Sequence, residues 1–288
     1  MIRVRNPAVA GYFYERDREA LINQLKWCFT HSLGPGEIPK VDYKGERGIL
    51  GLVSPHAGYI YSGPVAAHGF YALAQNGKPD IVVLVGPNHH GVGAPVSIYP
   101  EGMWKTPLGE LEVDGKIVEE LSESLRGLAE VEEEPHLFEH SLEVQLPFLQ
   151  FLFQKDFRIV SILMLAQNIF ASKELGDALS EILHGKNFII IASSDFTHYE
   201  PQERAERQDM QAIKAILTLE PRFLYDTIMK YDITMCGYGP VMVLMQVAKN
   251  LGGIKAKLLK YATSGDITGD RSSVVGYASI LFEKELKH

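Results

Sequence analysis

Residues 49–58, Ile-Leu-Gly-Leu-Val-Ser-Pro-His-Ala-Gly, join a short apolar run to a histidine in a turn of small residues. The arrangement recurs at 81–91 (Ile-Val-Val-Leu-Val-Gly-Pro-Asn-His-His-Gly) and at 188–198 (Phe-Ile-Ile-Ile-Ala-Ser-Ser-Asp-Phe-Thr-His). Each run is too short and too rich in β-branched residues for a helix, and is typical of a buried strand. Because side chains beyond the carboxyl ends of neighbouring strands in an open α/β sheet meet in one crevice, the three segments predict one site.

Helical and strand-like segments alternate along the rest of the chain. Apolar spacing predicts helices over residues 15–29, 64–74, 116–125, 140–153, 173–183, 204–217, 221–229 and 239–249. Residues 106–113 suggest a hairpin, and strands are expected at 95–99, 157–165, 255–262 and 273–282. This alternation predicts an α/β fold: a single domain over residues 1–288, with a mixed, mostly parallel sheet between helical layers and an antiparallel last strand.

Composition narrows the classes of function. The 288 residues carry 28 Lys and Arg against 36 Asp and Glu, a net charge of −8, and show no basic stripe. This balance argues against binding to nucleic acid or to an anionic membrane. The sequence shows no signal peptide and no run long enough to span a membrane. With only two cysteines there is no disulfide framework, so a cytoplasmic location is expected.

The first two strand-end segments supply imidazoles. His56 lies in a turn of small residues, where it is either a structural, hydrogen-bonded histidine or a functional one. Of the adjacent pair His89 and His90, only one can face a given site. The other, together with Asn88, is then expected to contact the site from beside it or to line the substrate pocket.

The third segment places Asp195 three residues before His198. This spacing puts both side chains on one side of a helical turn, if such a turn begins after Ser194. A carboxylate near an imidazole fixes its tautomer and raises its basicity, as a general base requires. The alternative is that Ser194 or Asp195 caps a helix and His198 is an exposed residue of its first turn.

Two further segments carry candidate side chains. Cys236 lies in a glycine-containing turn, where it is either a small buried residue or a thiolate within reach of a metal. His136 and His140 are four residues apart, but Leu137 stands where a zinc protease has its glutamate, which excludes that class. His140 and Glu143 are either structural residues near a helix start or side chains at the edge of the crevice.

The sequence resembles the MEMO family (mediator of cell motility), which is found across archaea and eukaryotes. The matching segments occur in family order along nearly the whole chain: residues 8–14, 55–59, 86–90, 139–143, 193–198 and 235–237. The family is similar in turn to the class III (LigB-type) extradiol dioxygenases, which are non-haem iron enzymes. The resemblance therefore implies a LigB-like sheet between helical layers.

The resemblance also implies roles for particular residues. His56, His89 and Cys236 match the metal ligands of the family, and His198 matches the acid–base histidine of the dioxygenases, with Asp195 beside it. Ring-cleaving enzymes use two histidines and a carboxylate, whereas the MEMO pattern has a cysteine in the third place. A thiolate favours copper(I), zinc or a differently tuned iron. Iron(II) (Fe²⁺) is the expected metal, with copper and zinc as alternatives.

Three functions follow as hypotheses. The first is a metal-binding protein that oxidises a small chelating substrate with iron, with His198 as the base. The second is a non-catalytic adaptor whose crevice holds a peptide or an anion. The third is a metallohydrolase of the zinc type, since two histidines and a cysteine are a known catalytic zinc set. A small molecule or a peptide is the expected ligand, and the sequence leaves the oligomeric state open.

Overall fold

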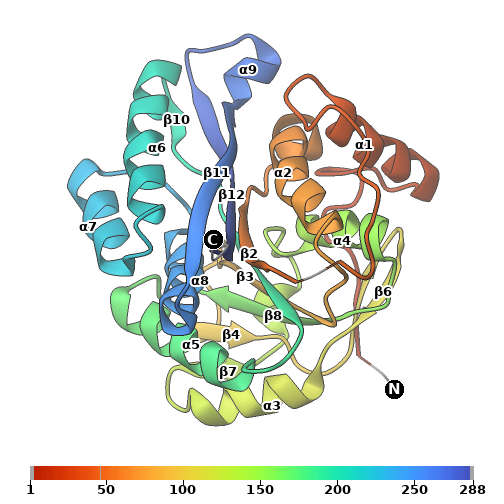
Figure 1. The fold of residues 1–288 in the computed structure, drawn as a ribbon, viewed down its shortest axis with the longest axis vertical. Coiled ribbons are helices and arrows are strands. Elements are labelled where there is room, and N and C mark those ends of the chain that lie inside the picture. Colours follow the sequence, from red (N-terminus) through yellow and green to blue (C-terminus); the bar gives the residue numbers. More distant parts are fainter. Residues whose placement is uncertain (1–2, 46, 286–288) are drawn as a thin grey trace.

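The main sheet of the computed structural model, which describes residues 3–45 and 47–285, is mixed and has nine strands. They are β2 (Ile49–Ser54), β3 (Ile81–Pro87), β4 (Val96–Ile98), β7 (Ala129–Val131), β8 (Arg158–Met164), β9 (Phe188–Ser193), β10 (His198–Glu200), β11 (Ile254–Thr263) and β12 (Val274–Lys284). Their order is β10-β12-β2-β9-β3-β8-β4-β7, with β11 also paired to β12 (Figure 1). The four central strands β2, β9, β3 and β8 run parallel. The last strand, β12, is antiparallel to β2, as predicted.

A smaller sheet lies beside the main one. It consists of β1 (Val4–Arg5), β5 (Met103–Thr106) and β6 (Gly109–Glu112). The pair β5–β6 is a hairpin over residues 103–112, three residues earlier at its start than the one predicted for residues 106–113, and β1 joins it in parallel. This sheet thereby brings the N-terminal segment against the middle of the chain.

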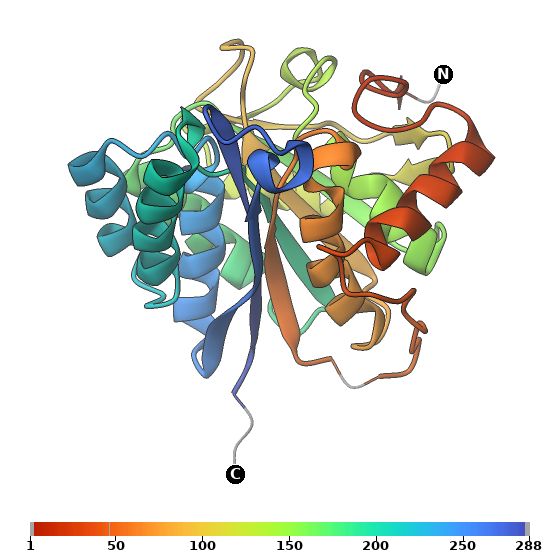
Figure 2. The same ribbon diagram turned by 90° about the horizontal axis from the view of Figure 1, so that it is seen from above.

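Helices cover both faces of the main sheet, as Figure 2 shows. Helices α1 (Arg18–Thr30), α2 (Tyr59–Ala74) and α4 (Leu146–Phe153) lie on one side. On the other side lie α5 (Ile169–Ile182), α6 (Gln202–Ile216), α7 (Pro221–Tyr231) and α8 (Tyr238–Leu251). The remaining helical segments are α3 (Gly115–Ser124), α9 (Ser264–Thr268) and the 3₁₀ turns η1 (Glu134–His136) and η2 (Glu143–Gln145). The predicted fold, an α/β domain with a mixed sheet between helical layers, is confirmed.

The central strands are buried along their whole length. All residues of β2 and β3 are buried, and so are all residues of β9 except Phe188. Continuous apolar runs of this kind are expected where helices cover both faces of a parallel sheet. The histidine and aspartate side chains of these segments therefore come only after the strands have ended.

Two predicted helices differ from the observed ones by five residues or more at their start. The helix predicted for residues 64–74 begins earlier, at Tyr59, and contains Pro64. The helix predicted for residues 140–153 is shorter: α4 begins only at Leu146, with Pro147 in its first turn. A proline is tolerated there because the first helical N–H groups have no partner within the helix. Residues 140–142 therefore lie outside the helix, in an irregular segment before the 3₁₀ turn η2.

Across residues 3–45 and 47–285, no helix is both long and apolar enough to cross a membrane. The cytoplasmic location expected from the cysteine count stays a prediction.

Candidate metal centre

The carboxyl ends of three adjacent parallel strands form one edge of the sheet. His56 lies two residues beyond the end of β2, His89 two beyond β3, and Asp195 two beyond β9. In the sheet, β9 lies between β2 and β3. The three segments therefore lie next to one another at this edge, as the sequence predicted.

Three imidazoles form a compact cluster there. His56, His89 and His140 each offer one ring nitrogen, and these three atoms all lie within 4.8 Å of one another. The centroid of the His56 ring lies 5.2 Å from that of His89 and 5.3 Å from that of His140. The rings of His89 and His140 stack on each other, with their centroids 4.6 Å apart. His140 was predicted only at the edge of the crevice, so the structure gives it a more central place.

Cys236 approaches the same cluster from the loop before α8. Its Sγ lies 3.2 Å from Nε2 of His56 and accepts a hydrogen bond of 3.3 Å from the backbone N–H of Asp195. Gln167 holds this loop by donating to the Cys236 carbonyl over 2.7 Å. A Cβ at Gly237 would lie 2.3 Å from the Ser193 carbonyl oxygen, so only glycine permits this approach.

Asp195 completes this side of the cluster. Its Oδ1 accepts a hydrogen bond of 2.8 Å from the backbone N–H of His56, and its Oδ2 lies 4.0 Å from Nε2 of the same residue. Burial raises the pKa of Asp195 to about 6, against the hydrogen bond from His56 and the charge of His198, which lower it. The carboxyl group is therefore easily protonated when no cation is near.

Replacing Asp195 with asparagine is expected to stabilise the metal-free protein at neutral pH. A carboxyl group with a raised native pKa stabilises the fold fully below its ordinary pKa of 3.8, and that stability is lost as the pH rises through about 6. The loss amounts to roughly 3 kcal/mol. The Asp195→Asn variant has no carboxyl group at this position and does not lose this stability, so the difference in free energy of unfolding between the variant and the wild type should grow between pH 4 and 7.5. Urea unfolding with a chelator present measures this, and an advantage independent of pH would contradict it.

Glu139 is a residue that the sequence did not single out. Its buried carboxylate accepts hydrogen bonds from Nδ1 and from the backbone N–H of His89, at 2.9 and 2.8 Å, and from the backbone N–H of Ser141 at 2.9 Å. Nδ1 of His140 lies 3.4 Å from the same carboxylate. One buried anion thus lies behind two imidazoles of the cluster. Only the family-like segment 139–143 pointed to it.

These contacts fix the state of the imidazoles. A carboxylate only accepts hydrogen bonds, so His89 carries its proton on Nδ1 and has a free lone pair on Nε2. Burial alone would lower the pKa of His89, but the hydrogen bond and charge of Glu139 outweigh it and raise the pKa. Burial lowers the pKa of His140 to about 4 and that of His56 well below its ordinary value. His56 and His140 are therefore neutral at neutral pH, as a metal ligand must be, whereas at His89 a metal competes with a proton for Nε2.

Replacing Glu139 with glutamine is expected to lower the pKa of His89 and to weaken metal binding about ten- to a hundredfold. The charge that opposes the effect of burial on His89 is lost, while the burial itself remains. An NMR titration of the His89 ring and calorimetry with metal test the two effects. Glu132→Gln is a matched control because Glu132 accepts hydrogen bonds from Ala94, in the loop after β3, and from Ser97 of β4, and bonds to no histidine among the described residues. Equal effects of both substitutions would contradict the role of Glu139.

His198 lies near the cluster, but not on a helical turn as expected. Residues 195–197 do not form a helix, and β10 begins at His198 and pairs with β12. In place of Asp195, which was expected to orient His198, the Thr234 carbonyl accepts from its Nδ1 over 2.8 Å. Since a carbonyl cannot donate, Nε2 of His198 keeps a free lone pair. The charge of His198 acts on the pKa of both His56 and Asp195.

The other predicted residues have structural contacts. Asn88 accepts from the backbone N–H groups of His90 and Gly91 and so shapes the loop, while His90 is exposed. Glu143 is buried and accepts hydrogen bonds from Arg5, Ala8, Val9 and Tyr14. Its carboxylate anchors the N-terminal segment, and these contacts leave it little capacity to bind a ligand.

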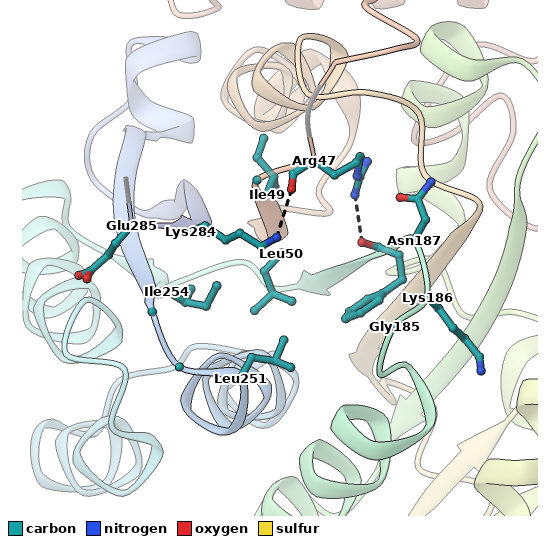
Figure 3. A pocket seen from close by; sticks show the side chains of 14 residues that line it. Arg47, Ile49, Leu50, Gly185, Lys186, Asn187, Leu251, Ile254, Lys284 and Glu285 are labelled. Atoms are coloured by element: carbon teal, nitrogen blue, oxygen red, sulfur yellow. Dashed lines mark hydrogen bonds between the residues drawn. The ribbon is translucent and has the colours of Figure 1, made fainter. Parts of the chain in front are cut away.

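A separate hollow of about 980 Å³ lies at the opposite, amino ends of the strands (Figure 3). Its lining includes Leu50, Phe188 and Ile254, and Lys284 reaches across to the Arg47 carbonyl at 3.5 Å. It contains none of the candidate metal-binding side chains. The chemistry of the protein therefore points to the histidine cluster, not to this hollow.

The fold and the cluster together define an α/β protein with a histidine centre at the carboxyl ends of its central parallel strands. Residues 5–281 match the family described as Memo-like protein, and the chain belongs to that family. It is 50% identical to a MEMO1 family protein of Pyrobaculum aerophilum over 98% of this chain and 99% of that protein. It is 48% identical to one of Ignicoccus hospitalis, over 97% and 98%.

One solved structure shows a related fold. It is an uncharacterized protein of Escherichia coli K12, with a TM-score of 0.51 and 14% sequence identity. The alignment covers 71% of this chain and 86% of that one. At this identity the likeness concerns the fold alone.

Proposed function

We propose that the protein binds a transition metal through His56, His89 and His140, with Cys236 as an additional ligand on the His56 side. The observation that carries the proposal is the convergence of three ring nitrogens within 4.8 Å of one another. The donors fit a metal chemically because Nδ1 of His56 and of His89 is engaged by Ser193 and Glu139, which leaves their Nε2 atoms for coordination, and burial keeps His56 and His140 neutral. Imidazoles suit iron, copper and zinc alike, and a thiolate suits zinc and copper(I) in particular.

Elemental analysis of protein purified without chelators tests this proposal. The wild type should carry metal, and the double variant His56→Ala/Cys236→Ser should carry almost none. His184→Ala, which removes an exposed histidine far from the cluster in sequence, is the control and should retain the wild-type content. Equal metal content in all three proteins would refute the site. Competition between iron(II), copper(I) and zinc for the apo protein then ranks the metals by affinity. We propose that iron(II) binds most tightly.

The function that we propose for this centre is oxidation of a small chelating substrate. Iron(II) bound there would supply oxygen activation and a Lewis acid for substrate hydroxyls. His198 would accept a substrate proton, since the Thr234 carbonyl keeps the lone pair of Nε2 free. Buried Asp195 beside His56 would counter the positive charge of the site. A general base of this kind contributes about a hundred- to ten-thousandfold in rate.

Oxygen uptake over a panel of catechols, after anaerobic loading with iron(II), tests this activity. Uptake that His198→Ala reduces at least about a hundredfold would support it. The main rival is metal-assisted hydrolysis, which three histidines favour because such a set binds catalytic zinc in other enzymes. Release of a chromogenic ester or phosphate by the zinc form would promote that rival. If neither assay detects activity but the crevice binds a peptide or an anion, the protein would be a non-catalytic adaptor.

A further inference from the structure

Ser193, the last residue of β9, lies directly against the His56 ring. It is fully buried, and its Oγ has three polar neighbours. Nδ1 of His56 is 2.9 Å away, the Ser141 carbonyl oxygen 2.7 Å, and Nε2 of Gln145 3.0 Å. A hydroxyl group offers one hydrogen and two lone pairs, so these three contacts use its whole capacity.

The direction of each bond follows from its partner. The Ser141 carbonyl can only accept, so it takes the hydrogen of Ser193. The Gln145 side chain also contacts the Pro55 carbonyl, at 3.0 Å, so its NH₂ group and not its oxygen lies on this side and donates to Ser193. The lone pair that is left on Oγ must accept from His56. The ring of His56 therefore carries its proton on Nδ1.

The opposite tautomer would lose a hydrogen bond. If the Ser193 hydroxyl donated to Nδ1 of His56, the Ser141 carbonyl would keep only a long contact of 3.5 Å with Gln145. A buried acceptor without a good partner is unfavourable, because it has given up its hydrogen bonds to water without replacement. Gln145 and Ser141 are themselves buried, so no solvent replaces the lost bond. The arrangement thus selects one tautomer before any metal arrives.

We propose that Ser193, held by Ser141 and Gln145, is a positioning residue that fixes the proton of His56 on Nδ1 and aims Nε2 into the metal centre. This inference rests on the proposed function for its purpose, but the tautomer is a property of the metal-free protein. The free Nε2 faces Cys236, whose Sγ lies 3.2 Å away. His56 is thus supported by a neutral hydroxyl, whereas His89 is supported by the carboxylate of Glu139.

Long-range ¹H–¹⁵N NMR spectra of the metal-free wild-type protein read the tautomer directly. We expect the His56 ring to show a protonated Nδ1 and an unprotonated Nε2 at pH 7.5. A ring protonated mainly on Nε2 would overturn the inference. The measurement needs no variant and no bound metal, so a protein with this tautomer that binds no metal would refute the proposed function and leave the role of Ser193 intact.

The variant Ser193→Ala then tests the consequence. We expect a mixture of His56 tautomers and metal affinity reduced about ten- to a hundredfold, as for other residues that support a ligand. Ser161→Ala is the matched control: Ser161 is a fully buried strand serine whose Oγ has no hydrogen-bond partner among the described residues. It should retain the wild-type affinity. A folded Ser193→Ala protein with the wild-type tautomer and affinity would contradict the positioning role.

Discussion

Replacing His140 with alanine is expected to weaken the binding of iron(II) or zinc by more than about a hundredfold, because changes behind a ligand already cost ten- to a hundredfold. His140 supplies one of the three converging nitrogens, and its ring stacks on that of His89. Calorimetric titration of the apo protein with metal measures the loss. His184→Ala is a suitable control because His184 is exposed. His136→Ala is not, because the His136 ring is buried beside Trp104 and its loss would disturb the core.

Cys236→Ser distinguishes two possible ligand sets, one of His56, His89 and His140 and one in which Cys236 takes the place of His140. Burial, together with the charge of Asp195, raises the pKa of the Cys236 thiol, so the thiol is protonated at neutral pH in the absence of metal. A metal that binds Sγ must displace this proton, so affinity should rise with pH and one proton should be released. Titration in buffers of different ionisation enthalpy detects it. Wild-type affinity in His140→Ala, with a large loss in Cys236→Ser, would restore His56, His89 and Cys236 as the ligand set.

The sequence predicted the part of the site that the sheet positions. His56, His89 and Asp195 each follow a buried parallel strand by two residues, so the order of the strands alone brings them together. Apolar runs, small residues in turns and the alternation of elements are local signals. They were sufficient for the fold class and for this edge of the sheet.

The remaining part depends on contacts between distant segments. Glu139 and His140 lie in an irregular segment before α4 that no strand orients, and Arg5 holds it by donating to the Glu139 carbonyl over 2.7 Å. The spacing of Asp195 and His198 suits a helical turn, but pairing of β10 with β12 extends the chain instead. Local spacing does not reveal such pairing, because Val275, which lies opposite His198 in the partner strand, comes 77 residues later.

Arg5 connects the N-terminal segment to this irregular segment. Its guanidinium donates to the carbonyl groups of His136 and Glu139 and to the carboxylate of Glu143, and it lies 4.4 Å from the centroid of the Trp104 ring. The side chains of Arg5 and Glu143 are both fully buried. Neither charge reaches water, so each depends on the other for compensation.

Arg5→Met is therefore expected to destabilise the protein by about 3–5 kcal/mol, because it leaves the Glu143 carboxylate buried without a counter-charge. Urea unfolding of the metal-free protein at pH 7 measures the loss. Adding Glu143→Gln should recover a large part of it, since the amide oxygen still accepts from Ala8 or Val9 while the uncompensated charge is gone. Arg222→Met breaks an exposed pair with Asp226 and should cost less than about 1 kcal/mol. Similar losses for Arg5→Met and Arg222→Met would show that the buried pair does not hold the segment that carries His140.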